Sequence, residues 1–362
     1  MTDKRWDVLA DRLINKSLMI KPQEKLMIMV QEIDSYPLAL ACYRECIKAG
    51  GYCQIQFMSE AIKHQILKYG NDDQINWIPE IEAYGMEWAD CYLGLKGAFN
   101  LNECFDISDE KLAKYQKAMG VVSSKRCENT RWTLVRVPNE RFAQQANVSY
   151  DKMMDMFFNA CNVNWNEEGL LNLKKHLAQG KHYHIVSDNT DLEMDVYGSS
   201  WTIENGGINV PEGEIYASPV WNTVNGYISF EYPATLGGKV IHNLRLDFKD
   251  GLVVNVQGDE NVDYVNKILD SDENARRVGE IAFGTNPAIV DVVTTDILID
   301  EKIPDSMHIA VGRNIVHDEN YYYSAIHWDI VKDMRTNSKV YIDDELVYEN
   351  GKFLYDDCKL VK

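Results

Sequence analysis

A histidine and an aspartate stand two positions apart in the segment AIHWDIV. The segment alternates apolar and polar residues, which is typical of a β-strand with one buried face. Successive side chains of a strand point to opposite faces, so we expect His327 and Asp329 to project from the same face. An imidazole nitrogen and a carboxylate directed at one point are ligands that Zn, Mn, Co and Fe accept. A buried histidine with a purely structural carboxylate partner is the alternative interpretation.

Three further residues could contribute to the same site. His308 lies in MHIAVG, an apolar segment that predicts a strand ending at a glycine. Glu214 in NVPEGEIY stands at a predicted turn that enters a strand, and Glu280 in GEIAFGTNP lies between a predicted helix and a glycine-rich turn. Carboxylates beside glycines at strand ends suit a cation site better than an apolar core. Taken singly, each carboxylate is more typical of a solvated turn.

The elements that must position these residues fall into two predicted domains. Residues 1–188 alternate strand-like and helix-like segments, which predicts an α/β domain with a parallel sheet. Its predicted strands are KLMIMV, YCQIQFM, WADCYLGLKG, RWTLVRVP and, as a possible fifth, HYHIVSD. Residues 189–362 show short strands joined by turns, such as a hairpin turn at Lys249-Asp250-Gly251, and one helix expected over 259–278. We therefore predict a mainly β, barrel-like second domain that carries the metal site.

The composition excludes several classes of function. The chain has 362 residues and a formal net charge of −19 at pH 7, so the phosphate backbone of a nucleic acid would be repelled. No stretch approaches the roughly 20 apolar residues of a membrane-spanning helix. The charged N-terminus lacks the apolar core of a signal peptide, and the eight cysteines form no Cys-x-x-Cys pair. We therefore expect a cytoplasmic protein without nucleic-acid or membrane partners.

Four segments, NVPEGEIYASP, GEIAFGTNP, MHIAVG and SAIHWDIV, occur in this order and resemble the metal-site motifs of the aminopeptidase T family of metallopeptidases. Segments of the N-terminal half, including PQEKLMIMV and RWTLVRVPNERFAQQANVSYDKMMDMFF, resemble that family too, so the similarity extends over nearly the whole chain. The resemblance implies an α/β N-terminal domain, a β-rich C-terminal metal domain and a homodimer. It also implies a metallo-aminopeptidase, a hydrolase that removes N-terminal residues from peptides or small amides with two divalent metal ions.

The resemblance also assigns the metal ligands motif by motif. Two carboxylates, an imidazole and a His-x-Asp pair match the family, in the order Glu214, Glu280, His308, His327 and Asp329. Glu280 is expected to bridge the two ions. The family has a further carboxylate shortly before the histidine motif, for which Glu301 is the candidate and Asp300 the alternative. Such a ligand set suits Zn, Co or Mn, which would activate a water molecule and polarise the scissile carbonyl.

The chain departs from the family pattern at two places. Family members usually carry a tyrosine seven residues after the motif histidine, a position held here by Ile315. The glycine-rich run before the His-x-Asp pair is replaced by a segment with Tyr321, Tyr322 and Tyr323. We expect these tyrosines to border the active site, where one phenol would donate a hydrogen bond to the developing oxyanion. Aromatic filling of a domain or dimer interface is the alternative.

Two other functions are compatible with the same residues. Ring-cleaving dioxygenases of the dihydroxypyridine type belong to the same superfamily and hold one iron with two histidines and one aspartate. His308, His327 and Asp329 would supply that set. The presence of Glu214 and Glu280 favours two metal ions instead. A metal-containing binding protein without turnover is the third possibility, supported by the replaced tyrosine.

Overall fold

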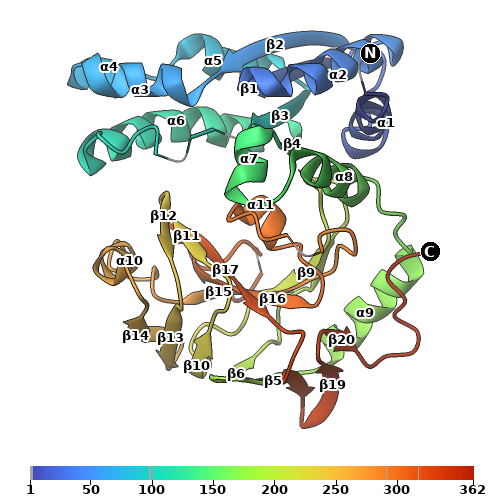
Figure 1. Ribbon diagram of the computed structural model, residues 1–362, viewed down its shortest axis with the longest axis vertical. Helices are drawn as coiled ribbons and strands as arrows, with labels where there is room; N and C mark the ends of the chain where they lie inside the picture. Colours follow the sequence, from blue (N-terminus) through green and yellow to red (C-terminus); the bar gives the residue numbers. More distant parts are fainter. Residues whose placement is uncertain (1–2, 98, 101, 291, 317) are drawn as a thin grey trace. The chain divides into compact units, whose positions relative to one another are not determined.

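The computed structural model describes residues 3–97, 99–100, 102–290, 292–316 and 318–362. The chain forms two compact units (Figure 1). The first comprises the chain up to Asn162 together with Gly206–Pro211, and the second comprises Val163–Asn205 and Glu212–Lys362. The domain boundary expected at residue 188 therefore lies inside the second unit. Helix α9 (Glu167–Gln179) and strand β5 (His182–Ser187) pack into the core of this β-rich unit.

A parallel sheet forms the centre of the first unit. Its five strands have the order β2-β1-β3-β4-β8 and all run in the same direction. The strands are β1 Lys25–Gln31, β2 Tyr52–Met58, β3 Cys91–Gly97, β4 Arg131–Val137 and β8 Asn209–Val210. The first four confirm the strands predicted from the sequence.

The prediction that HYHIVSD adds a fifth parallel strand is wrong. This segment is β5, which pairs antiparallel with β6 (Thr190–Asp195) in the second unit. Only Asp188 and Asn189 separate the two strands, and so short a link joins antiparallel neighbours, whereas parallel strands need a long crossover. The fifth place in the parallel sheet belongs to the short β8, which joins the first unit from a later part of the chain.

Helices cover both faces of this sheet because its strands carry apolar residues on both sides. One buried cluster joins Leu26, Ile28 and Val30 of β1 to helices α1, α2 and α8. A second cluster joins Met27 and Met29 to helices α5 and α6. The helices of this unit are α1 Arg5–Arg12, α2 Tyr36–Lys48, α3 Glu60–Tyr69, α4 Asp72–Ile75, α5 Glu80–Trp88, α6 Asp109–Asn129, α7 Glu140–Gln145 and α8 Tyr150–Cys161, with the π-helical turn η1 Leu13–Ser17 and the 3-10 turn η2 Ile33–Ser35.

The second unit is mainly β, as predicted. An eight-stranded antiparallel sheet has the order β14-β13-β10-β6-β5-β18-β19-β20, and a five-stranded antiparallel sheet has the order β17-β16-β15-β9-β7. One cluster of buried side chains contains residues of both sheets, so the expected barrel-like architecture takes the form of two sheets around a common core. The remaining strands are β7 Thr202–Glu204, β9 Glu214–Ala217, β10 Asn225–Ser229, β11 Ala234–Leu236, β12 Lys239–Ile241, β13 Arg245–Lys249, β14 Leu252–Gln257, β15 Val278–Gly284, β16 Ser306–Gly312, β17 His327–Asp333, β18 Lys339–Ile342, β19 Glu345–Glu349 and β20 Lys352–Phe353.

The turns of the second unit follow local sequence chemistry. The predicted hairpin joins β13 to β14, with φ of 51° at Asp250 and 81° at Gly251, as a tight hairpin turn requires. The helix expected over 259–278 is shorter, α10 (Val262–Leu269), because Asp270, Ser271 and Asp272 are poor helix formers and begin a series of turns. A further short helix, α11, spans Ile297–Asp300.

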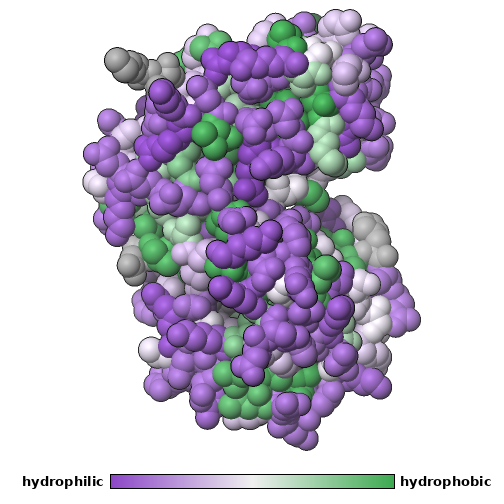
Figure 2. All heavy atoms as spheres, turned by 90° about the vertical axis from the view of Figure 1, so that its right-hand side faces the viewer, coloured by the Kyte–Doolittle hydropathy of each residue, from purple (hydrophilic) through white to green (hydrophobic). Residues whose placement is uncertain are grey.

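The surface is as polar as the content of charged residues predicts. The face in Figure 2 is mostly hydrophilic, with apolar side chains in separate patches. Within the described ranges, no helix is long and apolar enough to cross a membrane. All eight cysteines are free thiols.

Candidate metal centre

Four neighbouring strands of the five-stranded sheet bring the predicted ligands together. Glu214 begins β9, Glu280 lies in β15, His308 in β16, and His327 and Asp329 in β17. The expectation that Glu280 stands between a helix and a turn is wrong, because the preceding helix ends early and β15 already begins at Val278.

The strand register places these ligands on adjacent rows of one face. Glu280 lies opposite Ala310, and Ala310 lies opposite Asp329. His308 stands two residues before Ala310 in β16 and lies opposite Ala282 of β15. Directly opposed residues and residues two apart share a face of a sheet, so the three ligands point the same way. The small side chains of Ala282 and Ala310 leave room between the ligands. The residues that alternate with the ligands along each strand point to the opposite face and pack into the core.

Each oxygen of Glu280 faces a different histidine. The Nε2 atom of His308 lies 3.1 Å from Glu280 Oε1 and 3.4 Å from Glu214 Oε2. The Nε2 atom of His327 lies 3.9 Å from Glu280 Oε2 and 3.2 Å from Asp329 Oδ1. The Nδ1 atom of His327 lies 2.7 Å from the backbone carbonyl of Arg313. A hydrogen bond donated to that carbonyl orients the ring and directs Nε2 toward the carboxylates.

A buried lysine that sequence analysis overlooked lies against this cluster. The Nζ atom of Lys302 is 2.7 Å from Glu212 Oε1, 2.5 Å from Glu214 Oε1 and 2.7 Å from Glu301 Oε1. Burial opposes the charge of Lys302, but the three carboxylates outweigh it and hold its pKa well above the ordinary value. Neither Lys302 nor Glu212 has a distinctive sequence context, since both stand among other charged residues. Only their contacts reveal them.

The structure places Glu301, rather than Asp300, in the cluster. Asp300 Oδ1 accepts hydrogen bonds of 2.8 Å from the backbone N–H and from the hydroxyl of Thr294, and Oδ2 accepts one of 2.7 Å from the Thr295 N–H. These bonds hold the Asp300 carboxylate against the preceding loop. Glu301 instead lies with Glu214 and His308.

Among the described residues, three groups of side chains have the geometry of a metal site, and two of them lie in this cluster, the third being His176, Asp357 and Cys358. Glu214, Glu301 and His308 form one group, and Glu280, His308 and Asp329 form the other. Within each group, one potential ligand atom per residue lies within 4.8 Å of the others. Glu214 Oε2, Glu280 Oε2 and His308 Nδ1 are buried without a hydrogen-bond partner among the described residues. Buried carboxylate oxygens that accept no hydrogen bond are costly, so this set of oxygen and nitrogen donors fits divalent cations.

The titration behaviour of the ligands shows how strongly the cluster attracts positive charge. Burial raises the pKa of Glu280, although a hydrogen bond with His308 opposes the shift. Burial disfavours the charged form of His327, but the attraction of the Asp329 carboxylate is stronger and raises the pKa of His327 to about 10. Burial disfavours the charged form of Asp329 as well, but the attraction of His327 is stronger and lowers the pKa of Asp329 to about 2. A cation near these carboxylates is therefore strongly favoured.

The three consecutive tyrosines differ in their surroundings. Tyr321 and Tyr323 are 38% and 64% exposed. The hydroxyl of Tyr322 is buried and has no hydrogen-bond partner in the described part of the chain. Burial raises the pKa of Tyr322, and Arg277 is near enough to oppose that shift. The catalytic role of the three tyrosines stays a prediction.

Sequence analysis also overlooked a tyrosine on the face that carries the ligands. Ala282 of β15 has two direct neighbours, Tyr216 in β9 on one side and His308 in β16 on the other. Burial raises the pKa of Tyr216, and Glu204, Glu280 and Glu214 add to the shift. Its phenol therefore lies within electrostatic reach of the carboxylates. The position of Ile315, where the family usually has a tyrosine, is half-buried.

Comparison with known proteins decides the family. A family model described as thermophilic metalloprotease (M29) matches residues 2–353. The chain belongs to the M29 family. This confirms the family expected from the sequence motifs, and it makes the chain a metal-dependent peptidase and thus a hydrolase.

Relatives within the M29 family are named as aminopeptidases. The chain is 21% identical over 354 residues to Aminopeptidase 2 of Geobacillus stearothermophilus, covering 86% of this chain and 84% of the relative. It is 32% identical over 142 residues to Aminopeptidase T of Thermus thermophilus, covering 36% and 34% of the two chains.

Two solved structures share the M29 fold of this chain. Wild-type AmpT from Thermus thermophilus has a TM-score of 0.85 at 19% identity, with 97% of this chain and 99% of that chain covered. A 2,5-dihydroxypyridine dioxygenase from Pseudomonas putida has a TM-score of 0.59 at 12% identity, with 98% of both chains covered. The first confirms the predicted α/β plus β-rich architecture over nearly the whole chain.

Proposed function

We propose that this M29 metallopeptidase is an aminopeptidase that uses two divalent metal ions to remove N-terminal residues from peptides. The observation that carries the proposal is the balance of charge in the cluster. The cluster holds five carboxylates and one ammonium, that of Lys302. With the carboxylates ionised and the histidines neutral, as metal binding requires, four negative charges are left that two divalent cations would balance. The carboxylates are those of Glu212, Glu214, Glu280, Glu301 and Asp329.

The distances between the candidate ligands suggest two groups, one for each ion. Glu214, Glu301 and His308 would hold one ion, and Glu280, His327 and Asp329 the other. We expect Glu280 to bridge the two ions, and the proximity of its two oxygens to different histidines supports this role. Lys302 would keep three carboxylates close together and oriented, because each lies within hydrogen-bond distance of its ammonium.

The free amine of the substrate would confine cleavage to the N-terminal residue. Divalent ions held at this site would lower the pKa of a water molecule and polarise the scissile carbonyl. That amine would bind a metal ion or pair with a carboxylate of the site, whereas an acylated N-terminal nitrogen offers neither a basic lone pair nor a charge. The reaction would therefore be confined to the first peptide bond. Zn, Co and Mn are the metals that suit these ligands.

Metal content and substrate choice test this proposal together. Protein purified without chelators should contain about two Zn, Co or Mn ions per chain by mass spectrometry. It should cleave leucine p-nitroanilide and leave the matched N-acetyl-leucine p-nitroanilide intact. Equal cleavage of both substrates would overturn exopeptidase action, and a single tightly bound ion would overturn the two-metal site.

The dioxygenase alternative has one observation in its favour, the fold shared with the dihydroxypyridine dioxygenase at a TM-score of 0.59. The M29 family match and the TM-score of 0.85 with AmpT favour the hydrolase. One iron per chain and consumption of oxygen with a dihydroxypyridine would support the dioxygenase. Metal without any turnover would support a binding protein. A homodimer and a cytoplasmic location remain predictions made from the sequence.

A further inference from the structure

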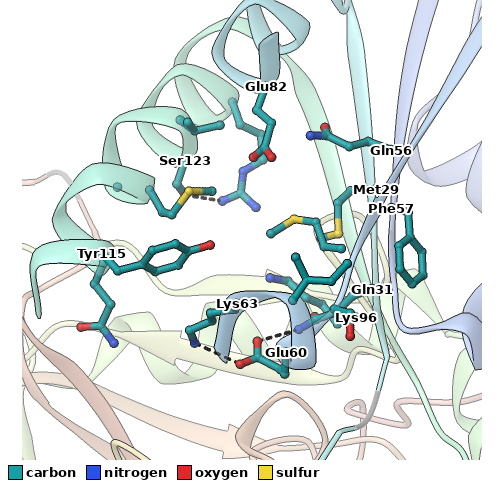
Figure 3. A pocket seen from close by; sticks show the side chains of 18 of the residues that line it. Met29, Gln31, Gln56, Phe57, Glu60, Lys63, Glu82, Lys96, Tyr115 and Ser123 are labelled. Atoms are coloured by element: carbon teal, nitrogen blue, oxygen red, sulfur yellow. Dashed lines mark hydrogen bonds and ion pairs between the residues drawn. The ribbon is translucent and has the colours of Figure 1, made fainter. Parts of the chain in front are cut away.

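An open cavity of about 520 Å³ lies wholly within the first unit, between the parallel sheet and helices α3, α5 and α6 (Figure 3). This volume is in the range of small-molecule sites. Much of the wall is apolar and rich in sulfur, with Met29, Met58, Met86, Met119, Phe57 and Tyr92. A sheet and its helix layer normally pack without such a space. The space therefore points to a ligand.

The cavity lies where parallel sheets of this type bind ligands. From β1 the chain passes outward to β2 on one side and then returns to β3 on the other, so the strand order reverses between β1 and β3. Gln31 ends β1, Met58 ends β2 and Lys96 stands near the end of β3, and all three line the cavity. Ligands of open α/β sheets bind outside the carboxyl ends of the strands at such a reversal.

Two side chains of opposite charge reach the cavity without an ion pair to any described residue. Glu82 points into it from α5 (Figure 3). Arg126 lines it from the last turn of α6. The Nη2 atom of Arg126 lies 3.4 Å from Ser123 Oγ and 3.3 Å from Cys127 Sγ, and its guanidinium carbon lies 4.6 Å from the centroid of the Trp132 ring and 5.5 Å from that of Tyr92. Its Nε atom is buried and has no hydrogen-bond partner in the described part of the chain. Burial raises the pKa of Glu82, with a hydrogen bond from Gln56 opposing the shift.

A glycine keeps the cavity open on the helix side. Gly120 lines it from the interior of α6, a helix of 21 residues. Glycine is less favourable than alanine in a helix interior. A Cβ atom added at Gly120 would meet no atom within 4 Å, so no neighbour requires glycine there. The missing side chain leaves space that a ligand can use.

We propose that this cavity binds a free α-amino acid with a large apolar side chain. The ammonium of the ligand would pair with Glu82, its carboxylate with Arg126, and its side chain would pack on the methionines and aromatic rings. A ligand with only one charge would leave Arg126 or Glu82 unpaired. All residues that line the cavity belong to the first unit, whereas the predicted metal ligands all belong to the second, so the cavity shares no residue with the metal cluster.

Methyl NMR of the full-length, metal-loaded protein with isotope-labelled methionine tests the proposal. L-phenylalanine should shift the methyl signals of Met29, Met86 and Met119, assigned by Met→Leu variants, in a saturable way. Phenethylamine and 3-phenylpropionate each lack one charge of phenylalanine and should bind at least ~10-fold more weakly. Equal binding of either analogue would overturn the assignment of a zwitterionic ligand. The absence of shifts at millimolar phenylalanine would overturn the site itself.

Three variants locate the binding within the cavity. Glu82→Gln and Arg126→Gln should each weaken binding by ~10-fold or more, because each removes one charge-assisted hydrogen bond. Gly120→Leu fills the space and raises the helix propensity of α6, so it should abolish binding in a folded protein. Gly207→Leu is its control, since Gly207 also has no atom within 4 Å of an added Cβ but does not line the cavity. Unchanged affinity in folded Gly120→Leu protein would contradict the proposal.

Discussion

The ammonium of Lys302 lies 2.7 Å from the carboxylate of Glu301, its neighbour in the sequence, and both side chains are buried. The same ammonium contacts Glu212 and Glu214. One lysine thus gathers three carboxylates of the cluster. Its charge supports the arrangement of carboxylates that the metal ions would need.

Replacing Lys302 with methionine tests this support. Methionine keeps much of the side-chain length but leaves three buried carboxylates without their cation. Removing one partner of a buried ion pair costs ~3–5 kcal/mol, so we expect a loss of that size in the free energy of unfolding by urea. Lys332→Met is the matched control, because Lys332 is equally buried but contacts a single, half-exposed carboxylate, that of Glu231, and should cost less. Unchanged stability of Lys302→Met would contradict the supporting role.

His327→Ala and Asp329→Ala should each remove at least one metal equivalent per chain while leaving the fold intact. Both side chains project from one face of β17 toward Glu280. Metal analysis together with circular dichroism measures the two effects. His184→Ala serves as control, since His184 forms a similar pair with Asp191, 2.8 Å away, outside the cluster. If both site variants keep their full metal content, these residues are not ligands.

Glu280→Gln should lower turnover by ~10²–10⁴-fold, the range typical of losing a central catalytic group. Glutamine keeps the shape of the side chain but loses the charge that would offset two dications. The measurement is kcat on leucine p-nitroanilide at saturating metal, with metal content determined in the same samples. Near wild-type turnover with two ions bound would exclude the bridging role.

Tyr→Phe changes at positions 321, 322 and 323 test the oxyanion donor. Tyr322→Phe should lower kcat by ~10²–10³-fold with little change in stability or metal content, because its buried hydroxyl is the one without a partner among the described residues. Tyr321→Phe and Tyr323→Phe are controls at more exposed positions. If all three variants remain fully active, the triplet is structural, and Tyr216 on the ligand face becomes the phenol to test.

Removal of metal by EDTA should lower the melting temperature. An ion that binds the native state at a thousandfold excess over its Kd stabilises the fold by ~4 kcal/mol. The clustered carboxylates would repel one another once the ions are gone. Scanning calorimetry before and after dialysis, and after adding back Zn, Co or Mn separately, measures the effect. A melting temperature that EDTA does not change would argue against resident metal ions.

Local patterns in the sequence were sufficient for part of this site. Alternation of apolar and polar residues predicted that His327 and Asp329 share one face of a strand, and the apolar segment around His308 predicted a strand as well. Both strands are confirmed as β17 and β16. Strands β1 to β4 of the parallel sheet were predicted in the same way. Such predictions succeed because side-chain direction in a strand depends on the adjacent backbone alone.

Those patterns could not predict which distant segments of the chain pair or contact one another. The segment of β5 has the composition of a buried strand, but nothing in it specifies pairing with β18, which lies about 150 residues later in the chain. Glu212 and Lys302 are 90 positions apart in the chain and carry no motif, yet their side chains lie 2.7 Å apart. The cavity with Glu82 and Arg126 likewise exists only because three helices cover the sheet incompletely.

The sequence by itself thus indicated which residues of this M29 peptidase could bind metal, and it predicted the two strands, β16 and β17, that present His308, His327 and Asp329. Only the tertiary structure decided that Glu301 rather than Asp300 joins the ligands, that Glu280 faces two histidines, and that Lys302 lies among the carboxylates. The physical reason is the range of the interactions. Strand propensity and side-chain alternation are properties of neighbouring residues, whereas the order of strands and the contacts of buried charges depend on packing between segments far apart in the chain.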